Sequence, residues 1–231
     1  MVRFLVIDTK LLDDLREVVN HFILVTMKQP ETQQSRKIGR PLSFDRDAAL
    51  RRAMLLFWKH GYEATSLSAL TKAMGVTPPS IYTAFGDKKQ LFLEAVTLYI
   101  EGGPLTPQQI IEDAPTARAA AERLLESAVL GDTGEDTPPG CLLASAAVSC
   151  SDDAADVKAA LAAMRGRIEA CLKNRFLFAI ETGELPANTD ADALAGHIMA
   201  VIQGLSTLAR DGATREKLTR VAASAMRAWP A

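Results

Sequence analysis

The sequence lacks most of the features on which enzymes, secreted proteins and membrane proteins depend. Its three cysteines, Cys141, Cys150 and Cys171, form neither an even disulfide set nor a metal-ligand spacing. No apolar run approaches the roughly 18 residues that a membrane-spanning helix needs. The motifs G-x-S-x-G and H-E-x-x-H, a phosphate-binding glycine loop and a dinucleotide fingerprint are all missing. We therefore expect a cytoplasmic protein that is not an enzyme, has no membrane partner, and needs neither a metal nor another cofactor.

Charge is distributed unevenly along the chain, although the net charge is only −2. Residues 36–83 carry eight lysines and arginines against three acids, whereas residues 102–231 carry twelve basic and seventeen acidic residues. A basic segment joined to an acidic body indicates that one part of the protein faces a polyanion. The alternative is a chance clustering of solvated charges, and charge alone does not decide between the two.

Helical periodicity and capping signals predict an all-α fold, since no stretch shows sustained period-two alternation. The first four helices are expected at about 45–60, 67–74, 78–85 and from 88 onward, until Gly102-Gly103-Pro104 breaks the last of them. Alanine-rich helices are then expected at about 116–130, 141–151, 153–181, 190–210 and 214–228. The predicted domains are an extension and linker over 1–35, a basic helical domain over 36–100 and a second helical domain over 101–231.

The second and third helices have the spacing of a helix-turn-helix. They are separated by Gly75-Val76-Thr77, and the third opens with Pro78, whose missing N–H costs nothing at a first helical position. The glycine permits a tight reversal, and the small or polar residues on one side of the third helix suit a helix that enters a major groove. A pattern of this kind is a weak signal when it stands alone.

Longer motifs surround this pattern. They include F-W-x-x-G-Y-E-A-T-S (57–66), S-I-Y-x-x-F-G-D-K (80–88) and, in the C-terminal half, G-C-L-L-A-S-A-A (140–147) and Q-G-L-S-x-x-A-R-D-G-A (203–213). With these motifs, residues 39–231 resemble the TetR family of transcription regulators. The resemblance implies an N-terminal three-helix helix-turn-helix domain and a C-terminal ligand-binding and dimerisation domain. It also implies a homodimer that binds double-stranded operator DNA, in most relatives as a repressor that a small-molecule effector releases.

The resemblance assigns DNA contacts residue by residue. Helix N-termini, hydroxyls and lysines meet phosphates, so Thr65 and Ser66 are expected at one phosphate and Lys88 at another. Tyr82 matches a tyrosine that reaches the DNA backbone, with a core aromatic as the alternative. Base contacts are expected from the face of the third helix, at Thr77, Pro79, Ser80 and Thr83. None of these forms a bidentate Arg–guanine or Asn–adenine pair, so DNA shape is expected to contribute to sequence choice.

A second DNA-binding element is expected in the basic linker. Arg36, Lys37 and Arg40 precede Pro41 and resemble an arm that lays arginine into a narrow minor groove. The alternative is a merely flexible linker. Residues 1–26 lie outside the family resemblance, and Met27 stands just before the polar segment 28–40. We expect residues 1–26 to be dispensable for DNA binding, as an extension that is not native or lacks structure, with Met27 as the start of translation. The alternative is that the apolar stripe over 11–23 packs on the body or a partner.

Two apolar patterns in the C-terminal half suggest further sites. Stripes on the last two helices are expected to form a four-helix subunit interface, with the core of a single chain as the alternative: Leu194, Ile198, Val201, Leu205, Leu208, Leu218, Val221, Ala225 and Trp229. An effector pocket is expected among the fourth helix and the middle helices, although such residues are often plain core: Phe92, Tyr99, Leu124, Met164, Ile168 and Phe176. Cys141, at a helix N-terminus, is either a redox-sensitive thiol or a small buried hydrophobe.

Overall fold

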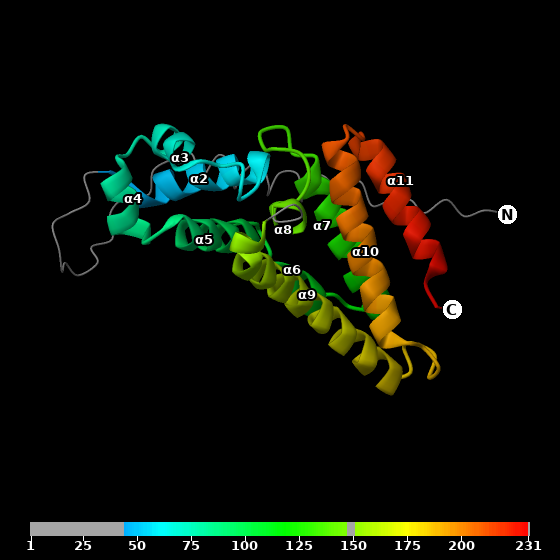
Figure 1. Cartoon of the computed structure of the whole chain (residues 1–231). Helices are drawn as coiled ribbons and strands as arrows, with labels where there is room; N and C mark the ends of the chain where they lie inside the picture. Colours follow the sequence, from blue (N-terminus) through cyan, green and yellow to red (C-terminus); the bar gives the residue numbers. More distant parts are fainter. Residues whose placement is uncertain (1–43, 147–150, 231) are drawn as a thin grey trace.

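The computed structural model describes residues 44–146 and 151–230. Within these ranges every regular element is a helix, which confirms the all-α prediction. Four helices form an elongated head at one end of the molecule: α2 (Arg46–His60), α3 (Leu67–Met74), α4 (Pro78–Phe85) and α5 (Lys88–Glu101) (Figure 1). Their bounds agree with those expected from the sequence.

Six further α-helices form the body: α6 (Pro107–Glu112), α7 (Ala117–Asp132), α8 (Leu142–Ser145), α9 (Ala155–Glu181), α10 (Ala191–Arg210) and α11 (Arg215–Ala225). Short 3-10 turns, Asp152–Ala154 and Met226–Ala228, precede α9 and follow α11. Helices α10 and α11 lie at the end of the molecule opposite α4, and α9 runs from the head to the far end of the body (Figure 1).

Local capping explains why the head helices begin where they do. The side chains of Asp45, Ser66 and Asp87 each accept a hydrogen bond from a backbone N–H in the first turn of α2, α3 and α5. These bonds satisfy N–H groups that have no partner inside the helix. Such contacts are local, so the sequence pattern was sufficient to place them.

The hydrophobic core divides into two clusters, and the division does not follow Gly102–Pro104. One cluster joins the head helices to α8 and to Val157 and Leu161 of α9. The other holds α6, α7, α10 and α11 together with Leu172 and Phe176 of α9. Ile168 packs against both clusters. Helix α9 is therefore shared between the head and the body.

Two parts of the body differ from the expected helices. Helix α6 was not predicted, although Thr106, Pro107 and Gln109 form a capping box with proline in the first turn. Helix α8 is only four residues long, whereas 141–151 was expected to be helical. At the end of α8, the carbonyl of Ala146 accepts a hydrogen bond from the Tyr62 N–H of the head at 3.0 Å. Residues 147–150 lie outside the described part of the chain.

Candidate DNA-binding site

Helices α3 and α4 form the helix-turn-helix that the sequence predicts. Gly75 has φ +71°, the left-handed conformation that closes α3, and Val76 N–H bonds the Thr71 carbonyl at 3.1 Å. Helix α4 then packs inward mainly through Ile81 and Phe85, which are 0% and 3% exposed, with Ala84 partly buried beside them. The remaining face of this eight-residue helix is turned away from the core of the head.

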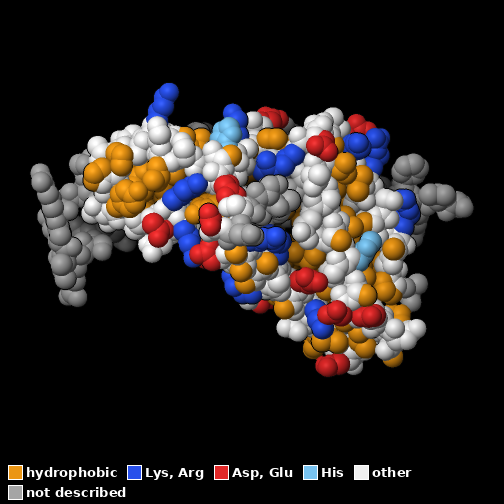
Figure 2. All heavy atoms as spheres, in the orientation of Figure 1, with side chains coloured by type: hydrophobic (Ala, Val, Ile, Leu, Met, Phe, Trp, Pro, Cys, Tyr) orange, Lys and Arg blue, Asp and Glu red, His pale blue; other side chains and the backbone are white. Residues whose placement is uncertain are grey.

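That outward face carries most of the residues predicted to read bases. Thr77, Pro79 and Thr83 are exposed, and Ser80 is half-buried. The hydroxyls of Thr77 and Ser80 lie 2.9 Å apart, and the Thr83 hydroxyl donates to the Pro79 carbonyl at 2.9 Å. The hydroxyls are thus tied to one another and to the helix backbone. Hydrophobic side chains cover the surface around α4, and charged ones are sparse there (Figure 2).

Tyr82 belongs to the same outward surface. Its side chain is 50% exposed. A core aromatic would be covered by neighbouring side chains, so the structure removes that alternative. The hydroxyl position is compatible with a contact to a phosphate beside α4.

The two residues that open α3 are placed differently from each other. Ser66 is exposed, and its oxygen accepts from the Ala69 N–H as the helix cap. Thr65 is 2% exposed, and its hydroxyl donates to the Gly61 carbonyl at 2.6 Å. Thr65 therefore stabilises the turn between α2 and α3. The phosphate contact expected of Thr65 is not available in this conformation, because its hydroxyl is buried and bonded to the backbone.

Lys88 opens α5 beside the helix-turn-helix. Its ammonium lies 4.5 Å from the centre of the Tyr62 ring and 3.4 Å from the Glu63 carbonyl oxygen. These contacts fix a positive charge at the N-terminus of a helix, where anions are favoured. The neighbouring Lys89 turns toward the body and forms an ion pair with Asp156 of α9. The family motif predicts a phosphate contact at Lys88, whereas the pairing of Lys89 with α9 is a contact between distant residues that the sequence does not reveal. Arg36, Lys37 and Arg40 of the predicted arm lie outside the described residues.

Comparison with known proteins identifies the family. Residues 49–95 match the family described as bacterial regulatory proteins, tetR family, and residues 119–226 match the tetracyclin repressor-like C-terminal domain. The chain is 37% identical over 194 residues to the HTH-type transcriptional repressor ComR of Escherichia coli K12. The matched region covers 83% of this chain and 92% of ComR. The chain belongs to the TetR family.

Another relative and a solved structure support this. The uncharacterized HTH-type transcriptional regulator YezE of Bacillus subtilis 168 is 26% identical over 78% of this chain and 94% of its own. A cysteine mutant of the TetR family regulator CifR, solved with 26-base-pair double-strand operator DNA, is 42% identical. It covers 83% of this chain and 100% of its own with a TM-score of 0.79. This TetR protein is thus a transcription regulator and not an enzyme.

The residues predicted to line a TetR effector pocket are divided between the two cores. Phe92, Tyr99 and Met164 pack in the head cluster, whereas Leu124 and Phe176 lie in the body cluster. Ile168 alone contacts both. They therefore do not belong to a single cluster, and the pocket stays a prediction.

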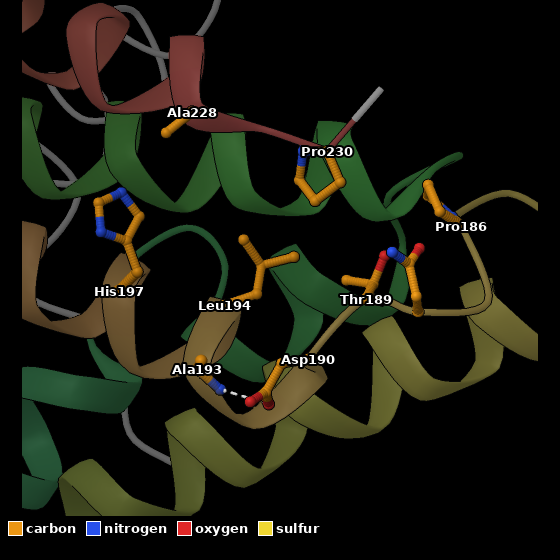
Figure 3. Close-up of a pocket in the computed structure, with 9 residues that line it drawn as sticks. Pro186, Thr189, Asp190, Ala193, Leu194, His197, Ala228 and Pro230 are labelled. Carbon is orange, nitrogen blue, oxygen red and sulfur yellow. Dashed lines mark hydrogen bonds between the residues drawn. The ribbon is translucent and has the colours of Figure 1, made fainter.

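A hollow is present elsewhere in the body. It has a volume of ≈ 500 Å³ and lies between the start of α10 and the segment after α11. Figure 3 shows Leu194 and His197 of α10 on one side of it, and Ala228 and Pro230 on the other. It lies far from α4, and none of the predicted pocket residues lines it.

The stripes predicted as the subunit interface mostly face the chain's own core. Ile198, Leu205 and Leu218 are at most 1% exposed, and the Trp229 ring packs edge-on against Phe176 with centroids 5.5 Å apart. Trp229 is partly buried against this core, and so are four more residues of the stripes: Leu194, Val201, Leu208 and Val221. Ala225 is half-buried. The alternative, a core within one chain, accounts for the fully buried members, because a side chain already covered cannot bury further area on a partner.

A different row of α10 is exposed to solvent: Ala193, His197, Ala200, Gln203, Gly204 and Thr207. These positions recur at intervals of three and four residues, which places them on one helical face. Three of the six, Ala193, Ala200 and Gly204, are small enough to allow another helix to approach the backbone closely. The apolar periodicity of the sequence identified a neighbouring face of the same helix, one residue further along and about 100° round the axis.

Close contacts join the head to the end of α10 at a junction formed by Trp58, Gly140 and Arg210. The Trp58 indole N–H donates to the Gly140 carbonyl at 2.5 Å, and Arg210 donates to the Trp58 carbonyl at 2.9 Å. Gly140 has φ +77°, and a Cβ there would lie 2.8 Å from the Ser206 carbonyl oxygen. The junction therefore leaves no room for a side chain at Gly140 and fixes the loop 132–140 against both domains.

Asp132 is buried and Cys141 half-buried at this junction. Burial raises the pKa of Asp132 to about 7, and the Arg210 charge offsets only part of that rise. Burial also raises the pKa of the Cys141 thiol, while its hydrogen bond with Tyr99 opposes the shift. A raised pKa disfavours the reactive thiolate, which favours the alternative of a small hydrophobic group over a redox-sensitive thiol. Nothing in the sequence marked Asp132, because burial of this carboxyl depends on contacts with distant helices.

Metal and membrane sites can be considered within the same part of the chain. Among the described residues no group of three or more His, Cys, Asp or Glu side chains is arranged to hold a metal ion. None of the helices described is both long and apolar enough to cross a membrane.

Proposed function

We propose that this TetR protein is a homodimeric repressor that binds a near-palindromic operator and is released by a small-molecule effector. The observation that carries the proposal is the exposed face of α4, which presents Thr77, Tyr82 and Thr83 to solvent. The CifR structure contains operator DNA, and ComR is named a repressor. Both support the same role here.

The operator is best found by selection from a random double-stranded library. Two recognition helices related by a two-fold axis bind half-sites that are inverted repeats, one or more helical turns apart. We expect the selected sequences to contain such a repeat and to include a site near the regulated gene. A library from which no sequence is enriched would argue against sequence-specific binding.

We propose that the two subunits meet through the exposed row of α10 and the outer face of α11. Small side chains at Ala193, Ala200 and Gly204 permit the close helix approach of a four-helix interface. Such an arrangement leaves the inward stripes in the core of each chain. It is also compatible with the position of α10 and α11 opposite the DNA-binding end (Figure 1).

We infer that the effector, a small apolar or amphipathic molecule, acts by shifting α9 between two positions. This helix is packed into both cores, and near its start Asp156 pairs with Lys89 of the head. A molecule that binds the DNA-incompetent state more tightly by a few kcal/mol shifts the population to that state. Crystals with and without effector should then differ in head separation; unchanged separation and unchanged operator affinity would exclude this mode of release for the compound used.

Lys88→Ala is expected to weaken binding to every DNA sequence alike. Because one phosphate contact is lost, the slope of log K against log salt should flatten by about one unit. Thr83→Ala should instead change preference at one base position and leave the slope unaltered. Titrations of operator and of unrelated DNA at several salt concentrations measure both. An altered sequence preference in Lys88→Ala, with its slope intact, would contradict this division of roles.

A further inference from the structure

Helix α2 contributes an arginine to the C-terminal end of each helix of the helix-turn-helix. The Arg46 guanidinium donates to the Ala84 carbonyl near the end of α4, from Nε at 3.3 Å and from Nη2 at 3.2 Å. Arg52 donates from Nη1 to the carbonyl of Met74, the last residue of α3, at 3.2 Å. One helix thus caps both members of the motif from outside.

These carbonyls are groups that need an external partner. The last four carbonyls of a helix have no intrahelical donor, and a cation at that end also interacts favourably with the helix dipole. Helices α3 and α4 have only eight residues each, a length at which isolated helices are not stable. The placement of α4 therefore depends on tertiary anchors.

Helix α4 has few such anchors besides Arg46. Two of its side chains are buried, and its N-cap residue Thr77 makes no side-chain bond to the helix backbone. At the other end the Arg46 guanidinium lies 4.4 Å from the centre of the Phe85 ring and forms an ion pair with Glu94 of α5 at 2.6 Å. Arg46 consequently connects α2, α4 and α5 at one point.

We propose that Arg46 is a positioning residue for operator recognition: it fixes the axis of α4 against α2 and α5, so that the exposed face of α4 meets the bases in register. Arg52 performs the corresponding role for α3. This inference rests on the proposed operator binding. The opposite interpretation is that Arg46 is one more phosphate contact on a basic head.

Arg46→Lys separates the two interpretations, because it keeps the charge and loses the planar fork. Lysine has no second nitrogen to replace Nε, which donates to the Ala84 carbonyl at 3.3 Å, and no planar guanidinium to lie over the Phe85 ring. A positioning role predicts that operator affinity falls about tenfold, as for a mismatched base pair. Affinity for unrelated DNA, and the salt slope of that binding, should stay within about twofold of wild type, since phosphate contacts remain.

Three further measurements complete the test. Lys59→Gln removes an exposed charge from the same helix and controls for long-range electrostatics. Hydrogen exchange of the α4 amides should increase in Arg46→Lys while that of α2 and α5 is retained, which shows a displaced helix in a folded head. Arg46→Met should resemble Arg46→Lys in its loss of operator preference, because neither side chain has the fork.

Each result bears on the proposal. The proposal would be overturned if Arg46→Lys bound the operator as tightly as wild type. It would also be overturned if Arg46→Met lost equal affinity for operator and unrelated DNA and showed a flatter salt slope. The first stage of the experiment requires the wild-type chain to bind its selected operator. Failure there would count against the proposed function itself, whereas failure in the variants alone would count against the role of Arg46.

Discussion

Asp132→Asn is expected to make the protein more stable at pH 8 and to leave its stability near pH 4 almost unchanged. Asp132 is 1% exposed at the junction of head and body, and burial raises its pKa to about 7. Among the described residues, neither Asp132 Oδ2 nor Arg210 Nε has a hydrogen-bond partner. The carboxyl is therefore held where its charged form is disfavoured and where the Arg210 charge compensates only part of the cost of burial.

The direction of this pH dependence follows from the pKa of Asp132 in the folded and in the unfolded chain. The folded carboxyl binds a proton more tightly than the unfolded one, whose ordinary pKa is 3.8. Wild-type stability should accordingly fall as pH rises from about 4 to about 7, at up to about 1.4 kcal/mol for each pH unit. Asparagine carries no charge at any of these pH values, so the variant should lose this slope and exceed wild type by about 2 kcal/mol or more at pH 8.

Urea unfolding of both proteins at pH 4.5, 6 and 8 measures the difference. Asp136→Asn is the matched control, because it neutralises an exposed acid of the same loop. It should change stability little at any pH. If the difference in free energy of unfolding between wild type and Asp132→Asn were the same at all three pH values, the Asp132 carboxyl would not be held in its neutral form.

Ala200→Glu is expected to convert the protein to a monomer and to reduce operator affinity by about 100-fold or more, because the second head no longer binds on the same molecule. Ala200 is exposed on the small-residue row of α10 and faces away from both hydrophobic cores. The single chain should therefore keep its fold. At a close helix interface the same glutamate would be buried without a partner, which is strongly unfavourable.

Sedimentation velocity and operator titration test this together. Ala170→Glu introduces the same charge at an exposed position of α9 and serves as the control. It should remain dimeric with unchanged affinity. If Ala200→Glu stayed dimeric while its far-UV spectrum matched wild type, the subunit interface would have to lie on another surface of the body.

Much of the head could be predicted from the sequence because its signals are local. Asp45, Ser66, Gly75 and Pro78 mark helix ends by contacts within a few residues, and the structure keeps all four roles. The family motifs added the phosphate and base contacts, which periodicity alone does not assign. Tyr82 then needed only its exposure to exclude a place in the core.

The parts that were missed depend on contacts between distant residues. Arg46 and Ala84 are separated by 38 positions, and Trp58 and Gly140 by 82. An arginine on a helix surface has the same sequence pattern whether it is solvated or caps another helix. For α10 the apolar period identified a buried face correctly, but a period does not tell whether that face is covered by the same chain or by a partner.

Hydroxyl-radical footprinting on the selected operator, with the mass of the complex measured in parallel, tests the central claim most directly. The claim is that two copies of the chain present their α4 helices to related half-sites. It predicts two protected regions related by a two-fold axis, centred one helical turn or a multiple of it apart, and a complex that contains an even number of chains. Protection of a single asymmetric site by one chain would contradict it.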